Sequence, residues 1–85
     1  MHEMSLALEV ARIAEAKLGA AAPRLVTVAV EVGDGAGVEP ANLEFCLDAV
    51  FSTPPFRGAK STIVPARGDV LQVAYLEVDD DDSYD

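Results

Sequence analysis

Residues 24–32 have the sequence Arg24-Leu25-Val26-Thr27-Val28-Ala29-Val30-Glu31-Val32, which is the strongest strand signal in the chain. Its four valines occupy every second position, so they fall on one face of an extended strand while the intervening residues fall on the other. Strict alternation of this kind predicts a β-strand with one buried face. The run of three glycines within residues 33–37 ends the strand.

Apolar spacing on both sides of this strand predicts two amphipathic helices. Before it, apolar residues recur with a period of about 3.6 from Ser5 to Leu18, with Ser5 as the expected cap and Gly19 as the stop. After it, Pro40 suits the first turn of a helix that runs to about Phe51. The apolar stripe of this second helix consists of Leu43, Cys46, Leu47, Val50 and Phe51, and its polar side consists of Asn42, Glu44 and Asp48.

Two further strands are expected, at residues 59–64 and 70–78, with a turn at residues 67–69 between them. The predicted fold is therefore α+β, with two helices packed on a small mixed three-stranded sheet in the order helix-strand-helix-strand-strand. A strand-helix-strand unit favours parallel pairing of the first two strands. The tight turn favours an antiparallel pair for the last two.

Length and charge limit the class of protein. A chain of 85 residues forms one domain, expected over residues 1–78. Fifteen acidic and six basic residues give a formal net charge of −9, which argues against non-specific binding to nucleic acid or to anionic membranes. Five of the acids lie in residues 79–85, and this acidic tail is expected to repel itself and to be disordered.

The location expected from the sequence is cytoplasmic. No apolar run approaches the roughly 20 residues that cross a bilayer. The amino terminus lacks the basic region and continuous apolar stretch of a signal peptide. A single cysteine, Cys46, excludes a disulfide within the chain and a zinc site built from pairs of cysteines.

His2 is the only histidine, and its position beside the amino terminus suggests a metal site. The Met1 amine, the His2 amide and the His2 imidazole can form fused chelate rings around one ion. Such a planar set of nitrogens suits Ni(II) or Cu(II). A further donor could be the Glu3 amide, a carboxylate or water. The alternative interpretation is a terminal histidine side chain that binds nothing.

The other candidate sites have simpler explanations. The glycine-rich run at residues 33–37 lacks the lysine and the Ser/Thr of a phosphate-binding loop, so a tight strand-to-helix connection is the better interpretation. Cys46 lies on the apolar stripe of a helix, which indicates a buried thiol. No histidine stands near it in the sequence, and no pattern of residues supports an enzymatic function.

The opening Met1-His2-Glu3-Met4-Ser5-Leu6-Ala7 resembles the start of the HypA/HybF family, the nickel-insertion accessory proteins of hydrogenase and urease maturation. The similarity continues in order along the chain, through residues 24–28, 37–40 and 68–73. It covers about residues 1–78. The resemblance implies a nickel metallochaperone that helps to deliver Ni(II) during [NiFe]-hydrogenase maturation.

The resemblance also implies a set of nickel ligands and partners. The ligands would be Met1 through its amine, His2 through its amide and imidazole, and Glu3 through its amide. Glu39 matches an acidic residue of the family's loop before the second helix, as a ligand or a neighbour of the ligands. The implied partners are a HypB-type GTPase and the hydrogenase large subunit.

The sequence departs from the family pattern between the second and third strands. Family members carry there a zinc-binding ribbon with two Cys-x-x-Cys pairs, whereas residues 65–69 here pass directly from one strand to the next. No structural zinc is therefore expected. The departure leaves open a second function, a metal-independent adaptor or assembly protein that keeps the docking fold. It also leaves open a homodimer or a strand-swapped oligomer.

Overall fold

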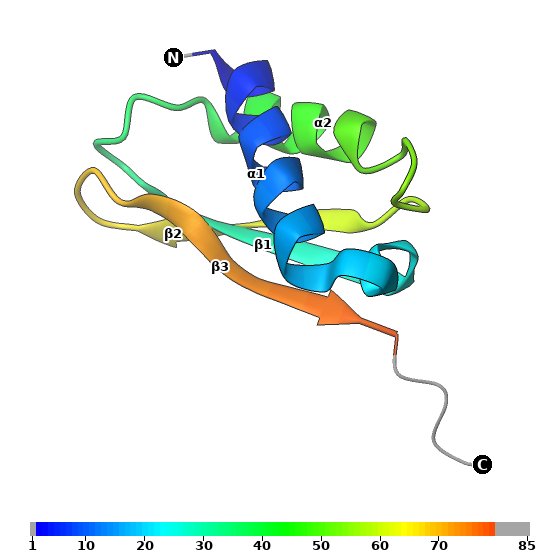
Figure 1. Ribbon diagram of the computed structural model, residues 1–85. Helices are drawn as coiled ribbons and strands as arrows, with labels where there is room; N and C mark the ends of the chain where they lie inside the picture. The colour runs from blue at the N-terminus through cyan, green and yellow to red at the C-terminus, as the bar shows by residue number, and fades with distance from the viewer. Residues whose placement is uncertain (1, 80–85) are drawn as a thin grey trace.

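The computed structural model describes residues 2–79 and confirms the α+β fold and the order of its elements (Figure 1). The predicted disorder of the acidic tail concerns residues 80–85, which lie outside the described residues. The elements are α1 (Glu3–Leu18), the 3-10 helix η1 (Gly19–Arg24), β1 (Leu25–Gly33), α2 (Pro40–Val50), β2 (Lys60–Ala66) and β3 (Leu71–Val78).

The sheet has the order β2-β1-β3, so β1, the strand predicted from the alternating valines, lies at its centre. β1 pairs in parallel with β2, from Thr27 opposite Lys60 to Gly33 opposite Ala66. It pairs antiparallel with β3, from Leu25 opposite Val78 onward. The predicted parallel pair is confirmed. The predicted pairing of the last two strands with each other is wrong, because β1 lies between them.

The chain passes from β2 to β3 over the carboxyl end of β1. Two strand spacings amount to about 10 Å, a distance that the four residues 67–70 can span. The end of β1 is hydrogen-bonded to this connection. The amide of Gly33 donates to the Val70 carbonyl at 2.7 Å, and the amide of Gly35 donates to the Gly68 carbonyl at 2.7 Å. Both glycines therefore lie directly against the backbone of the connection.

Gly33 is required by this close approach. A Cβ atom at residue 33 would lie 2.1 Å from the Gly68 carbonyl oxygen and 2.9 Å from the Val70 nitrogen. These are backbone atoms, which cannot rotate away as a side chain can. The glycine-rich run is thus a tight connection, as predicted.

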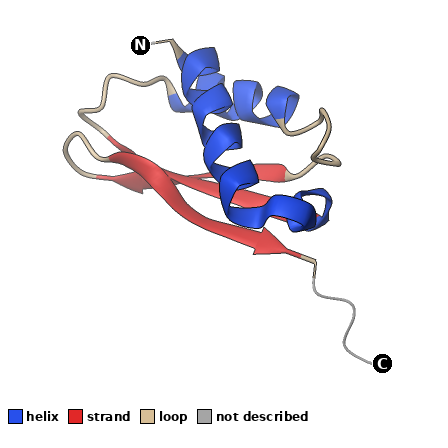
Figure 2. Cartoon of the chain, in the orientation of Figure 1, coloured by secondary structure: helices blue, strands red, loops and turns tan. Residues whose placement is uncertain are grey.

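Both helices cover the same face of the sheet (Figure 2). α1 buries Ala7, Val10 and Ala14, which recur at helical spacing. α2 buries Leu43, Cys46 and Leu47, so the predicted apolar stripe and the buried thiol are confirmed. Small residues on α1 and larger ones on α2 fill the space above β1.

Two local differences from the sequence prediction have physical explanations. Val26 is 43% exposed and Leu25 is 3% exposed, because an irregularity in the pairing with β3 at Leu25 and Thr27 shifts the alternation. α1 begins at Glu3 instead of Ser5, with His2 as the residue before the helix. An acidic residue in the first turn favours this earlier start.

Polar contacts fix α2 over β2. Asp48 was predicted to point away from the core, and it is exposed, but its carboxylate reaches the neighbouring strand. The Ser61 hydroxyl donates to Asp48 Oδ1 at 2.7 Å, and the Ser61 amide donates to the same oxygen at 3.2 Å. Because Ser61 is 9% exposed, these bonds satisfy a polar group that β2 places against the helix.

We predict that Gly33→Ala destabilises the protein by about 3 kcal/mol, because the added methyl group would push the 67–70 connection away from β1. Gly37→Ala is the matched control. Gly37 has a φ of 73° with open space around it, so only the backbone conformation opposes the substitution, at about 1 kcal/mol. Urea unfolding of both variants measures the difference. Equal losses of unfolding free energy in the two variants would contradict a steric cost at residue 33.

Candidate functional site

His2 lies at the free end of α1, where its backbone precedes the first helical turn. It is exposed, and its side chain makes no capping hydrogen bond to the helix. The Leu6 amide donates to the His2 carbonyl at 3.2 Å. The amides before Leu6 have no carbonyl four residues earlier in the helix to accept from them. The amide nitrogens of residues 2 and 3 are therefore outside the helical hydrogen-bond ladder.

The Glu3 carboxylate joins the start of α1 to the start of α2. Glu3 Oε2 accepts a hydrogen bond from the Glu39 amide at 3.0 Å, and Glu3 Oε1 accepts one from Asn42 Nδ2 at 3.0 Å. Glu39 immediately precedes α2, and Asn42 lies in its first turn. We call these two bonds the Glu3 tether. The tether brings the predicted residues His2, Glu3 and Glu39 to one end of the two helices.

The tether also holds the Glu3 carboxylate in its charged form. The hydrogen bond from the Glu39 amide is the largest cause that lowers the pKa of Glu3 below its ordinary value of 4.5. The Glu3 amide and the Asn42 side chain lower this pKa further. Donors that bind the charged form favour it. The end of the helix pair thus carries a negative charge down to acidic pH.

Two features of this site were not predicted from the sequence. Glu3 was expected to contribute its amide, whereas the structure engages its carboxylate, and Asn42 was assigned only to the polar side of its helix. The sequence did contain a sign that the start of α2 is held from outside the helix. α2 begins with Glu39-Pro40, without the Ser, Thr, Asp or Asn that caps most helices, and it has no side-chain cap of its own. The start of α2 is instead held from outside the helix, by the Glu3 carboxylate.

Three of the four residues predicted for the metal site lie at the same end of the helix pair. His2, Glu3 and Glu39 are grouped by the fold, and Met1 lies outside the described residues. Between His2 and Asp79 no three His, Cys, Asp or Glu side chains are arranged to hold a metal ion. The nickel ligands predicted from the sequence do not form such a cluster of side chains, because they are one imidazole and nitrogen atoms of the main chain.

The glycine-rich segment does not offer its amides to a phosphate group. The amides of Gly33, Asp34 and Gly35 donate to the carbonyls of Val70, Ala66 and Gly68. A phosphate-binding loop needs such amides unpaired and pointing at the ligand. Separately, over residues 2–79 no helix has the length and apolar character needed to cross a membrane.

Comparison with known proteins identifies the group of proteins that this chain resembles. The family described as hydrogenase/urease nickel incorporation, metallochaperone, HypA, matches residues 1–75. The hydrogenase maturation factor HypA of Geobacter metallireducens is 39% identical over 71 residues, and that of Geobacter sulfurreducens is 38% identical over 71 residues. Each alignment covers 81% of this chain.

The alignments cover most of this chain and a smaller share of each relative. The alignments span 63% of the length of the two Geobacter proteins. The hydrogenase maturation factor HypA of Albidiferax ferrireducens is 37% identical over 78 residues, which cover 91% of this chain and 69% of that protein. The family match runs from the terminal Met-His-Glu through α1, the sheet and α2 into β3. The chain therefore belongs to the HypA family.

Proposed function

We propose that this chain binds Ni(II) at its amino terminus and helps to deliver it during [NiFe]-hydrogenase maturation. The ligands are the Met1 amine, the His2 amide and imidazole, and the Glu3 amide. The observation that carries the proposal is the start of α1 at Glu3 with His2 exposed before it, in a chain of the HypA family. No bond-making chemistry is required, because the work is coordination, release and docking.

The start of α1 supports this donor set. An amide nitrogen can bind Ni(II) only after it loses its proton, and a proton held in a helical hydrogen bond is harder to remove. The amides of residues 2 and 3 have no helical acceptor, so a metal would replace no bond of the ladder. At residue 3 it would replace the contact of the Glu3 amide with the Glu3 carboxylate. The negative charge on the Glu3 carboxylate favours a divalent cation nearby.

Glu39 and the partners complete the proposal. The Glu3 tether holds the Glu39 backbone beside the first turn of α1, which supports a role for the Glu39 carboxylate as a nickel ligand or a neighbour of the ligands. The receiving partners are a HypB-type GTPase and the hydrogenase large subunit. They would dock on the face formed by the terminus and the loop of residues 33–39.

We expect one Ni(II) ion per chain in a calorimetric titration of protein that has an authentic Met1 amine, with a visible absorption band of planar nitrogen coordination. His2→Ala should lose both the heat and the band. Glu15→Gln, on the exposed surface of α1, is the matched control and should bind as the wild type does. Equal binding by the wild type and His2→Ala would refute delivery from this terminus.

Nickel binding and the Glu3 tether should fail in different pH ranges. An α-amino group has a pKa of about 7.7–8, so nickel affinity should fall about tenfold per pH unit below it for each proton released. The hydrogen bonds that lower the pKa of Glu3 also stabilise the fold at pH values above 4.5, the ordinary pKa of the group. This stabilisation is lost as the pH falls through the lowered pKa of the folded protein.

The two pH ranges can be separated with one variant. Glu3→Gln keeps the shape of the side chain and removes its charge. We expect the nickel-free wild type to melt above Glu3→Gln at pH 6–7 and to lose this advantage below pH 4.5. Thermal melts followed by circular dichroism measure the difference. An advantage that vanished together with nickel binding, near pH 7, would mean that the tether does not persist as proposed.

A cellular test distinguishes nickel delivery from the alternative of a metal-independent adaptor. One extra residue before Met1 moves the amine out of the chelate and leaves the fold unchanged. If the chain delivers nickel, hydrogenase activity in cells that depend on it should fall to the level of cells without it. An adaptor would keep full activity. Added nickel in the medium should restore part of the activity in the first case.

A further inference from the structure

β3 is an outer strand whose free edge lacks two common forms of protection. The sheet order leaves one side of β3 without a neighbouring strand within residues 2–79, and Figure 2 shows it at the margin of the sheet. β2, the other outer strand, begins with Lys60 and contains Pro65, which has no amide to donate. The segment Leu71–Val78 has no proline, lysine or arginine. Proteins commonly place these residues on an edge to prevent pairing with another strand.

The backbone groups of four β3 residues point to this free edge. The Val70 carbonyl accepts a hydrogen bond from the Gly33 amide, and the Asp79 amide donates to the Arg24 carbonyl, so residues 70 and 79 bond toward β1. Successive residues of a strand direct their backbone groups to opposite sides. Counted inward from both ends of β3, the residues whose amides and carbonyls face outward are Leu71, Val73, Leu76 and Val78.

The same four side chains leave apolar surface exposed beside α1. They lie opposite buried residues of β1, which are Val32, Val30, Val28 and Leu25. Leu71, Val73 and Leu76 pack against the core but are only half-buried, and Val78 is 36% exposed. Two hollows of about 120 and 470 Å³ lie between β3 and α1, lined in part by these side chains. Neither α1 nor α2 completes the core along this edge.

A bulge in the middle of β3 restricts which strand can pair there. Ala29 lies opposite Tyr75 and Val30 lies opposite Val73, so Ala74 is an extra residue without a partner on β1. The alternation of side chains between the two faces is interrupted at this point. A bulge usually protects an edge, because a regular strand cannot match the faces on both sides of it. A second β3 in antiparallel order can match them, since its own bulge lies at the same place.

We propose that a second copy of this chain pairs with β3 in antiparallel order, about a two-fold axis between residues 74 and 75. In this register Leu71 lies opposite Val78 of the other copy, and Val73 lies opposite Leu76 of the other copy. Residues with outward backbone groups then oppose one another, and apolar side chains meet apolar side chains on the helix-covered face. The two sheets become one continuous sheet of six strands. The contact is isologous, so it closes at a dimer.

The distribution of charge is compatible with this register. Glu77 is the only charged residue of β3, and it lies opposite Gln72 of the other copy, so no acid faces an acid. Gln72 Nε2 donates to Glu31 at 2.7 Å and keeps a second N–H for Glu77 of the other copy. Each chain has a formal net charge of −9, so long-range repulsion opposes the dimer and salt should favour it.

The length of the contact sets its expected strength. Eight residues of an extended strand span about 26 Å. This contact is small beside the interfaces of permanent dimers, so the association should depend on protein concentration.

Sedimentation velocity of the metal-free chain tests the pairing. The wild type should shift from monomer toward dimer between about 10 µM and about 1 mM, at lower concentrations when salt is added. Ala74→Glu should raise the dissociation constant about tenfold, because the two added carboxylates would lie about 6 Å apart across the axis. Thr62→Glu is the matched control, since it adds the same charge to an exposed position of β2. A wild type that stays monomeric throughout, or equal effects of the two substitutions, would overturn the proposal.

A mixture of opposite charges tests the position of the axis. Ala74→Lys alone should associate as weakly as Ala74→Glu, because like charges again meet across the axis. The two variants mixed should form a heterodimer that is tighter than either homodimer. Thermal melts of each variant verify that it folds. A mixture that associates no better than its components would show that residue 74 does not lie at the axis.

Oxidation of a single introduced cysteine tests the same geometry by chemistry. Ala74→Cys should form a disulfide between copies, because a separation of about 6 Å between the two Cα atoms lies within the range of disulfides. Thr62→Cys is the matched control and should cross-link much more slowly. The native Cys46 is buried. Equal rates for the two variants would contradict pairing at β3. Every sample contains a chelator and no nickel, so these outcomes are independent of the proposed metal site.

Discussion

The structure depends on the contact between the end of β1 and the backbone that crosses it. The Gly33 amide donates to Val70 at 2.7 Å, and a side chain at residue 33 would collide with the Gly68 carbonyl. This contact allows β1 to pair with β2 on one side and β3 on the other, with only four residues between the two outer strands. A central strand paired on both sides then provides the surface that both helices cover.

The helices are placed by different kinds of contact. Apolar packing against the sheet sets which face of each helix is buried, through Val10 on α1 and Leu43 and Leu47 on α2. Polar contacts set where α2 lies along its axis. The Asp48 carboxylate binds Ser61 on β2 near one end of α2, and the Glu3 carboxylate binds the Glu39 amide at the other. Two carboxylates thus fix both ends of a helix whose amino end has no side-chain cap.

Much of the fold followed from the sequence because it rests on local periodicity. The alternating valines predicted β1, and the apolar stripe ending near Phe51 predicted α2. The strand order did not follow, because a turn at residues 67–69 suits a hairpin as well as a passage across a third strand. Only the approach of Gly33 to Gly68, 35 positions later in the chain, distinguishes the two.

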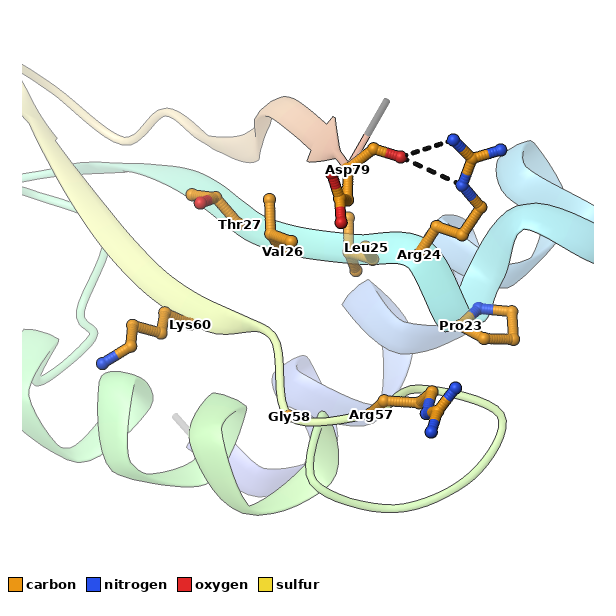
Figure 3. Close-up of a pocket in the computed structure, with 9 residues that line it drawn as sticks. All are labelled: Pro23, Arg24, Leu25, Val26, Thr27, Arg57, Gly58, Lys60 and Asp79. Atoms are coloured by element: carbon orange, nitrogen blue, oxygen red, sulfur yellow. Dashed lines mark hydrogen bonds between the residues drawn. The ribbon is translucent and has the colours of Figure 1, made fainter. Parts of the chain in front are cut away.

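The candidate site, too, was predictable only where it rests on a local sequence pattern. The terminal Met-His-Glu is a local pattern and could be recognised from the sequence. The role of the Glu3 carboxylate depends on residues 36 and 39 positions away, and no periodicity relates them. The cavity lined by Arg24, Arg57 and Lys60 is likewise an outcome of the sheet order, because the parallel pairing of β1 with β2 brings the starts of the two strands side by side (Figure 3).

The Glu3 tether has a consequence for how the two helices influence each other. One carboxylate at the start of α1 accepts hydrogen bonds from the Glu39 amide just before α2 and from the Asn42 side chain in its first turn, so the conformations of the two helix starts are linked. Thermodynamic coupling of this kind is reciprocal. If a ligand that reorganises residues 2 and 3 changes the affinity of α2 for a partner, that partner changes the affinity for the ligand by the same factor. For the nickel site proposed at the terminus, this coupling would let a partner bound to α2 change the nickel affinity without contacting the metal.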